Sequence, residues 1–202
     1  HGQIRRQRQM CIRDSLVAEH IVNGAFWNMG ENCSAISRLI VHKDIKSELL
    51  KKIVDRLRDW KTGDPLDPQN HLGALIDKEH CIKVSRYLCE GAVIGGKIDG
   101  NFVTPTIYET TTDDKKARDE IFGPILSVLE VQTNEEAISI ANKTKYGLTA
   151  SIFSANTRNA LRAARELRAG TVTVNSYGEG DIATPFGGYK QSGFGGRDNG
   201  VH

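Results

Sequence analysis

Cys33 is the side chain with the greatest potential for nucleophilic chemistry in this sequence. It lies in the run Gly-Glu-Asn-Cys-Ser-Ala at residues 30–35, shortly before an apolar run at residues 39–41. A thiol is nucleophilic only as the thiolate, so it needs access and nearby hydrogen-bond donors. A glycine-containing break ahead of an apolar strand can provide both. The alternative is a buried structural cysteine, since free cysteines are among the most buried residues.

The other three cysteines form no recognisable redox or metal motif. Cys11, Cys81 and Cys89 contain no Cys-x-x-Cys pair and no metal-like spacing with histidine. Cys81 and Cys89 are eight residues apart in a segment with helical periodicity, which predicts a shared face and core packing. This usage of cysteine indicates a reducing compartment, and we expect a cytoplasmic protein.

The composition predicts a folded globular protein without a membrane or nucleic-acid partner. Hydrophobic residues make up 39% and charged residues 26% of the 202 positions, which is typical of a folded domain. No apolar run approaches the roughly 20 residues of a membrane span, and no secretory signal is present. Four arginines and one aspartate give residues 1–15 a charge of +3, which leaves −1 for the remainder of a chain with a net charge of +2. The body therefore lacks a basic excess.

The two ends of the chain differ from its body. Residues 1–15 are rich in arginine and glutamine and lack apolar periodicity, which predicts a leader that is disordered or foreign to the fold. A basic interaction arm is the alternative. The chain stops at His202 after a glycine-rich stretch. We therefore expect a fragment whose folded domain covers residues 16–202.

Strands and helices alternate along that domain. Apolar runs predict strands, a hairpin is expected where Asp99 precedes Gly100, and four-residue apolar steps predict amphipathic helices. Asp44, Asp77 and Thr133 are the expected N-caps. The alternation favours an α/β domain with a largely parallel sheet. The expected helices cover residues 16–27, 44–57, 77–90, 157–167 and a segment from 133, and the strands residues 38–42, 92–94, 102–107, 125–131, 148–153 and 171–175.

Three separated motifs together resemble the aldehyde dehydrogenase superfamily. The run at residues 30–35 is similar to its catalytic-cysteine motif, and Glu-Ile-Phe-Gly-Pro at residues 120–124 to its cofactor motif. Pro-Phe-Gly-Gly-Tyr-Lys-Gln-Ser-Gly at residues 185–193 resembles its C-terminal signature, with a Lys-Tyr-Gly-Leu turn at residues 145–148 between them. The resemblance implies the α/β catalytic domain alone, without the Rossmann-like cofactor domain, and a homo-oligomer for the full-length protein.

In the reaction that the resemblance implies, the Cys33 thiolate adds to a small-molecule aldehyde. The thiohemiacetal passes hydride to NAD or NADP, and water hydrolyses the resulting thioester to the carboxylic acid. The Cys33 backbone N–H would stabilise the oxyanion. In the family the second oxyanion donor and the general base lie upstream of this segment. We interpret Glu31 as a structural or solvated acid rather than that base.

The resemblance also assigns binding residues. Glu120 would accept hydrogen bonds from the nicotinamide ribose, Phe122 would pack near the nicotinamide, and His80 would help to hold the ribose. Ordinary surface or core positions are the alternatives for these three. At Ile36 many relatives have glycine, so local packing is expected to differ. The residues that would line the aldehyde tunnel are Trp27, Asn32, Ser34 and Phe186.

Two acids suggest the substrate. Glu179 and Asp181 match positions at the tunnel mouth, where they would favour an aldehyde with a distal positive charge. An aminoaldehyde is therefore expected, and the loop resembles that of γ-glutamyl-aminobutyraldehyde dehydrogenases. The alternative is a solvated acidic turn. The residues that distinguish NAD from NADP lie upstream in the family, so both cofactors stay open.

Two other functions compete with the dehydrogenase. One is a truncated domain with only a structural or association role, since we expect the isolated chain to lack dehydrogenase activity. The other is a cysteine hydrolase that uses Cys33 with His42 or His80. The three motifs in order favour the dehydrogenase over both.

Overall fold

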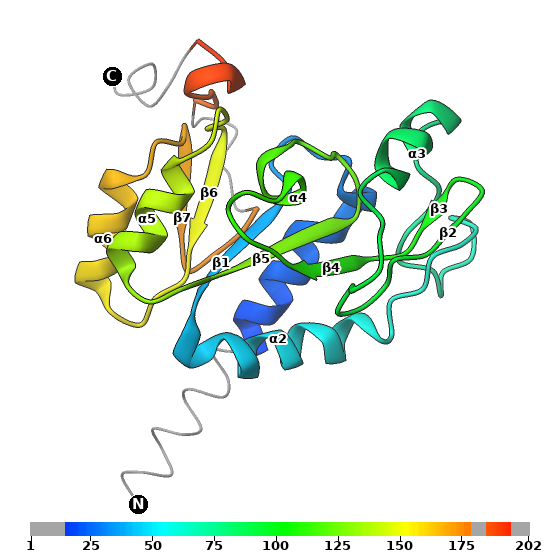
Figure 1. Cartoon of the computed structure of the whole chain (residues 1–202), viewed down its shortest axis with the longest axis horizontal. Coiled ribbons are helices and arrows are strands. Elements are labelled where there is room, and N and C mark those ends of the chain that lie inside the picture. The colour runs from blue at the N-terminus through cyan, green and yellow to red at the C-terminus, as the bar shows by residue number, and fades with distance from the viewer. Residues whose placement is uncertain (1–14, 179–184, 195–202) are drawn as a thin grey trace, which may run out of the picture. The chain divides into compact units, whose positions relative to one another are not determined.

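The computed structural model describes residues 15–178 and 185–194. By their internal contacts the residues divide into two compact units, His1–Glu130 and Val131–His202, which are coloured along the chain in Figure 1. Each unit is described on its own below. Glu179 and Asp181 lie outside the described residues.

The first unit is built around a three-stranded sheet with the order β1-β5-β4. β5 (Ile125–Val131) is central and pairs in parallel with β4 (Thr106–Glu109). β1 (Arg38–His42) lies on its other side. All residues of β5 except Glu130 are buried, as expected for a central strand covered on both faces. The predicted strand boundaries at 38–42 and 125–131 are confirmed.

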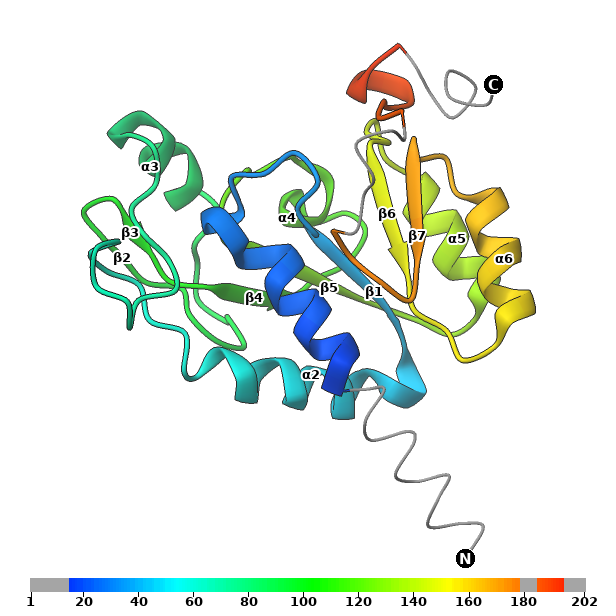
Figure 2. The ribbon, with the colours of Figure 1, turned by 180° about the vertical axis from the view of Figure 1, so that it is seen from behind.

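Two helices cover this sheet. One spans residues 15–26, and the other is α2 (Lys43–Leu57); Figure 2 shows the first crossing the sheet face. Their apolar stripes meet the strands in one core, in which Phe26, Ile53 and Leu126 are fully buried. Burial of such side chains is the main stabilising contribution to the unit.

The N-cap of α2 differs from the expectation. His42, not Asp44, caps the helix, because its Nδ1 accepts a hydrogen bond of 3.3 Å from the Asp44 N–H. Asp44 instead occupies the first turn, where its negative charge suits the helix dipole. The prediction of Asp44 as the cap was wrong by two positions.

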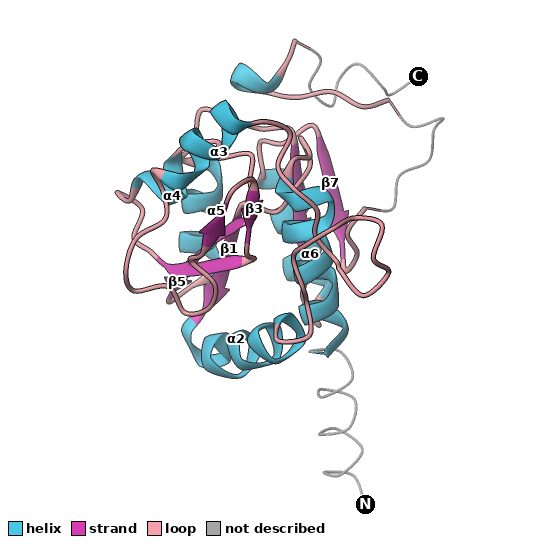
Figure 3. Cartoon of the chain, turned by 90° about the vertical axis from the view of Figure 1, so that its right-hand side faces the viewer, coloured by secondary structure: helices cyan, strands magenta, loops and turns pink. Residues whose placement is uncertain are grey.

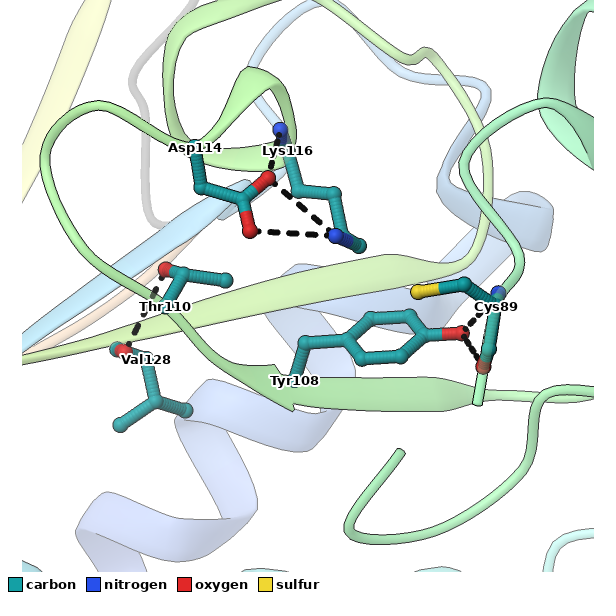
Figure 4. Close-up of polar contacts among 6 residues, drawn as sticks. All are labelled: Cys89, Tyr108, Thr110, Asp114, Lys116 and Val128. Carbon is teal, nitrogen blue, oxygen red and sulfur yellow. Dashed lines mark hydrogen bonds and ion pairs between the residues drawn. The ribbon is translucent and has the colours of Figure 1, made fainter. Parts of the chain in front are cut away.

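α3 (Lys78–Ser85) begins as expected but ends five residues early. The Asp77 carboxylate accepts a 2.7 Å bond from the His80 N–H, which confirms that cap. Beyond the helix, the Tyr108 hydroxyl accepts from the Cys89 N–H at 2.9 Å and donates to the Cys89 carbonyl at 2.8 Å (Figure 4). A buried side chain of β4 thus bonds both backbone groups of Cys89, which lies within the range where a helix was expected. Cys81 is buried and Cys89 exposed, so the predicted shared face was wrong.

A short hairpin precedes β4. β2 (Ile98–Asp99) pairs antiparallel with β3 (Phe102–Val103), and Gly100 in the turn has φ +56°, a conformation that favours glycine. The predicted hairpin is confirmed. The strand expected at residues 92–94 is only a single bridge between Ile94 and Ile107. α4 (Lys115–Arg118) follows β4.

The second unit is a parallel β-α-β arrangement. β6 (Thr149–Ile152) and β7 (Thr171–Val174) pair in parallel, and α6 (Thr157–Glu166) connects and contacts both. α5 (Asn134–Asn142) packs on α6. The Thr133 hydroxyl accepts from the Glu136 N–H at 3.1 Å, so this predicted cap is confirmed.

Both units consist of helices and strands (Figure 3), which confirms the α/β class. The pairs β4–β5 and β6–β7 are parallel, as expected, and lie in separate sheets. Among the helices that the structure describes, none is both long and apolar enough to cross a membrane.

The Tyr108 hydroxyl yields a stability prediction. Tyr108 is 3% exposed, and this burial raises the pKa of its hydroxyl. Tyr108→Phe leaves the Cys89 N–H and C=O without this partner, so we expect a loss of about 1–3 kcal/mol in unfolding free energy. Urea titration measures it. Tyr87→Phe is the control, since its hydroxyl bonds Asp119 in a less buried place. Equal losses in the two variants would contradict the role given to Tyr108.

Candidate active site

Cys33 lies in a turn that follows the abrupt end of a helix. The helix over residues 15–26 ends in a 3₁₀ turn, Trp27–Gly30, in which Asn28 and Met29 have φ of 51° and 57°. Gly30 follows with φ +70°. Such left-handed residues cannot continue a right-handed helix, so the chain turns away before it reaches the cysteine. The thiol is exposed, and the alternative of a buried Cys33 is wrong.

Backbone and side-chain bonds shape the turn around the thiol. The Asn32 carboxamide oxygen accepts from the Ser34 N–H at 3.2 Å and from its hydroxyl at 3.1 Å. The Asn32 carbonyl accepts from the Ala35 N–H at 3.0 Å, and the Ile36 N–H donates to Gly24 O at 2.8 Å. Asn32 and Ser34 therefore flank Cys33 and order its loop. Ile36, the departure from the family pattern, packs against the core of the first unit.

The cysteine loop touches the segment at residues 120–124. A Cβ on Gly30 would lie 2.5 Å from the Gly123 carbonyl oxygen, so here the two backbones are in direct contact. Gly123 is itself confined, because a Cβ there would lie 2.9 Å from Val84 of α3. Two motifs that are far apart in sequence are thus brought together by two glycines.

Glu31, His80 and Phe122 connect the loop, α3 and that segment. The Glu31 carboxylate accepts from the Ile76 N–H at 3.1 Å and lies 3.4 Å from His80 Nε2. The same Nε2 lies 2.6 Å from the Phe122 carbonyl oxygen. The Glu31 and His80 side chains are only 10% and 13% exposed. Glu31 is a structural acid, as expected, whereas the alternative of His80 as a surface histidine is wrong.

Of the other predicted residues of this unit, two are exposed and the rest are partly buried. Trp27 is 63% exposed, Glu120 is exposed, and Phe122 is partly buried with φ +60°. The Phe122 ring stands edge-on to the His80 ring, with centroids 6.4 Å apart. An exposed carboxylate and a partly buried aromatic ring thus belong to the segment whose Gly123 contacts the loop of Cys33.

The arrangement gives no support to a Cys-His hydrolase. His80 directs Nε2 at the Phe122 carbonyl and Glu31, and His42 uses Nδ1 to cap α2. Both imidazoles are thus engaged in holding backbone. Within residues 15–178 and 185–194, no cluster of three or more His, Cys, Asp or Glu side chains could hold a metal.

The glycine-rich motif at residues 185–193 forms hydrogen bonds that stabilise the second unit. Lys190 Nζ donates to the carbonyls of Asn142 and Thr144 at 2.8 and 3.0 Å, where α5 ends and cations are favoured. The Gly147 N–H donates to the Ser192 hydroxyl at 3.0 Å. Sequence reasoning missed this role, because local spacing does not connect Lys190 with a helix end far upstream. Phe186 also lies in this unit and is 58% exposed.

A known family matches nearly the whole chain. The model of the aldehyde dehydrogenase family matches residues 13–202. The chain belongs to this family. The cysteine loop, the Glu-x-Phe-Gly-Pro segment and the glycine-rich C-terminal signature all lie within the matched residues.

Named relatives add detail. An aminoacetaldehyde dehydrogenase of Pseudomonas aeruginosa is 54% identical over 194 residues, which is 92% of this chain and 39% of the relative. The structure of a gamma-glutamyl-gamma-aminobutyraldehyde dehydrogenase from Burkholderia cenocepacia is 44% identical with a TM-score of 0.86, over 90% of this chain and 39% of that one. An indole-3-acetaldehyde dehydrogenase of P. syringae in complex with NAD+ is 43% identical, with the same TM-score and coverage. The chain spans about two fifths of the length of these relatives.

The contact between the glycines yields a prediction. Gly30→Ala adds a methyl group 2.5 Å from the Gly123 oxygen at a φ of +70°. A left-handed alanine alone costs about 1–2 kcal/mol, and the overlap adds to it, so we expect a marked drop in the melting temperature. Gly91→Ala is the matched control, because Gly91 has φ +87° and a Cβ there would meet nothing within 4 Å. Equal destabilisation of both variants would show that the dihedral angle, not the contact, constrains Gly30.

Proposed function

We propose that the protein containing this chain oxidises an aldehyde to a carboxylic acid, with Cys33 as nucleophile and NAD+ or NADP+ as hydride acceptor. Residues 16–202 form its catalytic domain. The observation that carries the proposal is an exposed thiol in a loop whose Gly30 contacts Gly123 of the cofactor motif. Membership of the aldehyde dehydrogenase family supports a site in which a nucleophilic cysteine and a cofactor segment act together.

Cys33 supplies the covalent step. Its thiolate attacks the aldehyde carbon and forms a C–S bond, while the carbonyl oxygen becomes the oxyanion of a thiohemiacetal. The Cys33 backbone N–H is our candidate donor to that oxyanion. After oxidation, water attacks the thioester carbon, the C–S bond breaks, and the acid leaves a free thiol. Glu31 is held by Ile76 and His80, so we do not assign it as the base for that water.

The chemistry of the segment at residues 120–124 and of His80 fits a nicotinamide dinucleotide. The exposed carboxylate of Glu120 can accept hydrogen bonds from ribose hydroxyls, and Phe122 offers an aromatic face. His80 lies against Phe122 and is a third candidate for contact with the ribose. When bound, the dinucleotide accepts the hydride that leaves the substrate carbon. The P. syringae relative was solved with NAD+, which supports the same class of cofactor here.

The proposed substrate is an aminoaldehyde. Trp27, Asn32 and Ser34 are candidates to line its path to the thiol, together with Phe186. Glu179 and Asp181 would attract the distal ammonium group by charge. The Pseudomonas and Burkholderia relatives are named for aminoacetaldehyde and gamma-glutamyl-gamma-aminobutyraldehyde, which supports this substrate class. From the cysteine content we also propose a cytoplasmic location, and from the family a homo-oligomer.

Replacement of the nucleophile tests the function. Cys33→Ser should reduce both aldehyde-dependent NADH formation and hydrolysis of activated esters by several orders of magnitude, because the nucleophile is lost. NADH absorbance and nitrophenol release measure the two reactions. Cys89→Ser is the matched control, since Cys89 is the other exposed cysteine of the described residues. Dehydrogenase activity that survives in Cys33→Ser would refute the assignment.

Charge removal tests the substrate. Glu179→Gln with Asp181→Asn should lower kcat/KM for an aminoaldehyde at least about tenfold and leave an uncharged aliphatic aldehyde unchanged, because only the former loses an ionic attraction. The control is Glu79→Gln with Glu90→Gln, which removes the same charge from exposed positions of the first unit. Equal kcat/KM for the two aldehydes in the unaltered protein would overturn the aminoaldehyde proposal.

A further inference from the structure

One side-chain connection joins the loop of Cys33 to the segment at residues 120–124 in addition to the glycine contact. Glu31 is two residues before Cys33, and His80 is in the first turn of α3. His80 Nε2 lies 2.6 Å from the Phe122 carbonyl and 3.4 Å from the Glu31 carboxylate. A histidine of one helix therefore lies between two segments that are distant in sequence.

The chemistry of these partners assigns the proton on His80. A carbonyl oxygen and a carboxylate oxygen are both acceptors, so Nε2 must carry the hydrogen to bond either of them. The 2.6 Å contact makes the Phe122 carbonyl the principal partner. The carboxylate at 3.4 Å contributes mainly as a negative charge beside the N–H. With side chains that are 10% and 13% exposed, water competes weakly for these interactions.

The backbone at Phe122 needs such support. Its φ of +60° is unusual for an aromatic residue, because a side chain in the left-handed region meets its own backbone. Strained residues of this kind persist only where the surroundings hold them. The His80 N–H holds the carbonyl of this residue, and the backbone of Gly30 meets the next one, Gly123.

We propose that His80 and Glu31 are positioning residues that hold the Cys33 loop in register with the segment at 120–124. Their link sets where the thiol stands relative to Glu120 and Phe122, and it rests on the function proposed above for these groups. Glu31 also holds the segment just before α3, because its carboxylate accepts a hydrogen bond from the Ile76 N–H. His80 thus acts through the Phe122 carbonyl in addition to any contact with a ribose.

Hydrogen exchange of the 202-residue chain tests the link without cofactor or turnover. His80→Ala should speed exchange in peptides covering residues 26–36 and 118–126 by about tenfold, the effect of losing one hydrogen bond to a partly buried group. His80→Gln should restore slow exchange in both, because its amide N–H can donate to the Phe122 oxygen. Lys83→Ala, an exposed position on the same helix, is the matched control and should leave both peptides unchanged.

Glu31 provides an independent variant if His80→Ala fails to fold. Glu31→Ala should speed exchange at residues 26–36 and at Ile76, while Glu31→Gln, which keeps an acceptor oxygen, should change it much less. Because the contact between the two side chains is lost in either single variant, the double variant His80→Ala with Glu31→Ala should speed exchange at residues 26–36 by less than the product of the two single effects.

The labelling rate of Cys33 with iodoacetamide, read by peptide mass spectrometry against Cys89 in the same chain, should change in His80→Ala and return in His80→Gln. Unchanged exchange at residues 26–36 in His80→Ala, or additive effects in the double variant, would overturn the proposed link. The dehydrogenase proposal fails on a different result, namely activity that persists without Cys33.

Discussion

The close approach of Gly30 and Gly123 is the constraint on which the candidate site depends. No side chain fits at either position, because a Cβ on Gly30 would overlap a carbonyl oxygen and a Cβ on Gly123 would crowd Val84. Backbone contact at this point brings the cysteine loop and the Glu-x-Phe-Gly-Pro segment together. A glycine is therefore required in each motif for a steric reason, independent of any role in chemistry.

The reactive position is produced by an interruption of regular structure. Left-handed residues at Asn28 and Met29 stop the first helix before it would bury Cys33. The loop that follows is held by its own hydrogen bonds and by Glu31. The rigid sheet and helices beneath supply the apolar core, so the loop can be exposed without loss of order. The second unit uses the same principle, since Lys190 and Ser192 fasten a glycine-rich segment to the end of α5 and the turn at Gly147.

Local patterns predicted most of the regular elements. The strands at residues 38–42 and 125–131 and the caps at Asp77 and Thr133 depend on burial patterns and side-chain chemistry within a few residues. The chain beyond α3 differs, because its partners lie outside the local window. Past Ser85 the Tyr87 and Leu88 N–H groups bond carbonyls three residues back, and Cys89 bonds Tyr108 on a distant strand.

The sequence by itself determined the α/β class, the family motifs and the identity of Cys33 as the nucleophilic candidate, because these depend on residue types and short spacings. Only the tertiary structure decided that Cys33 is exposed, that Gly30 meets Gly123, and that His80 faces inward to Phe122 and Glu31. Such contacts join residues far apart along the chain. They depend on how the helices and strands pack, which no local pattern encodes.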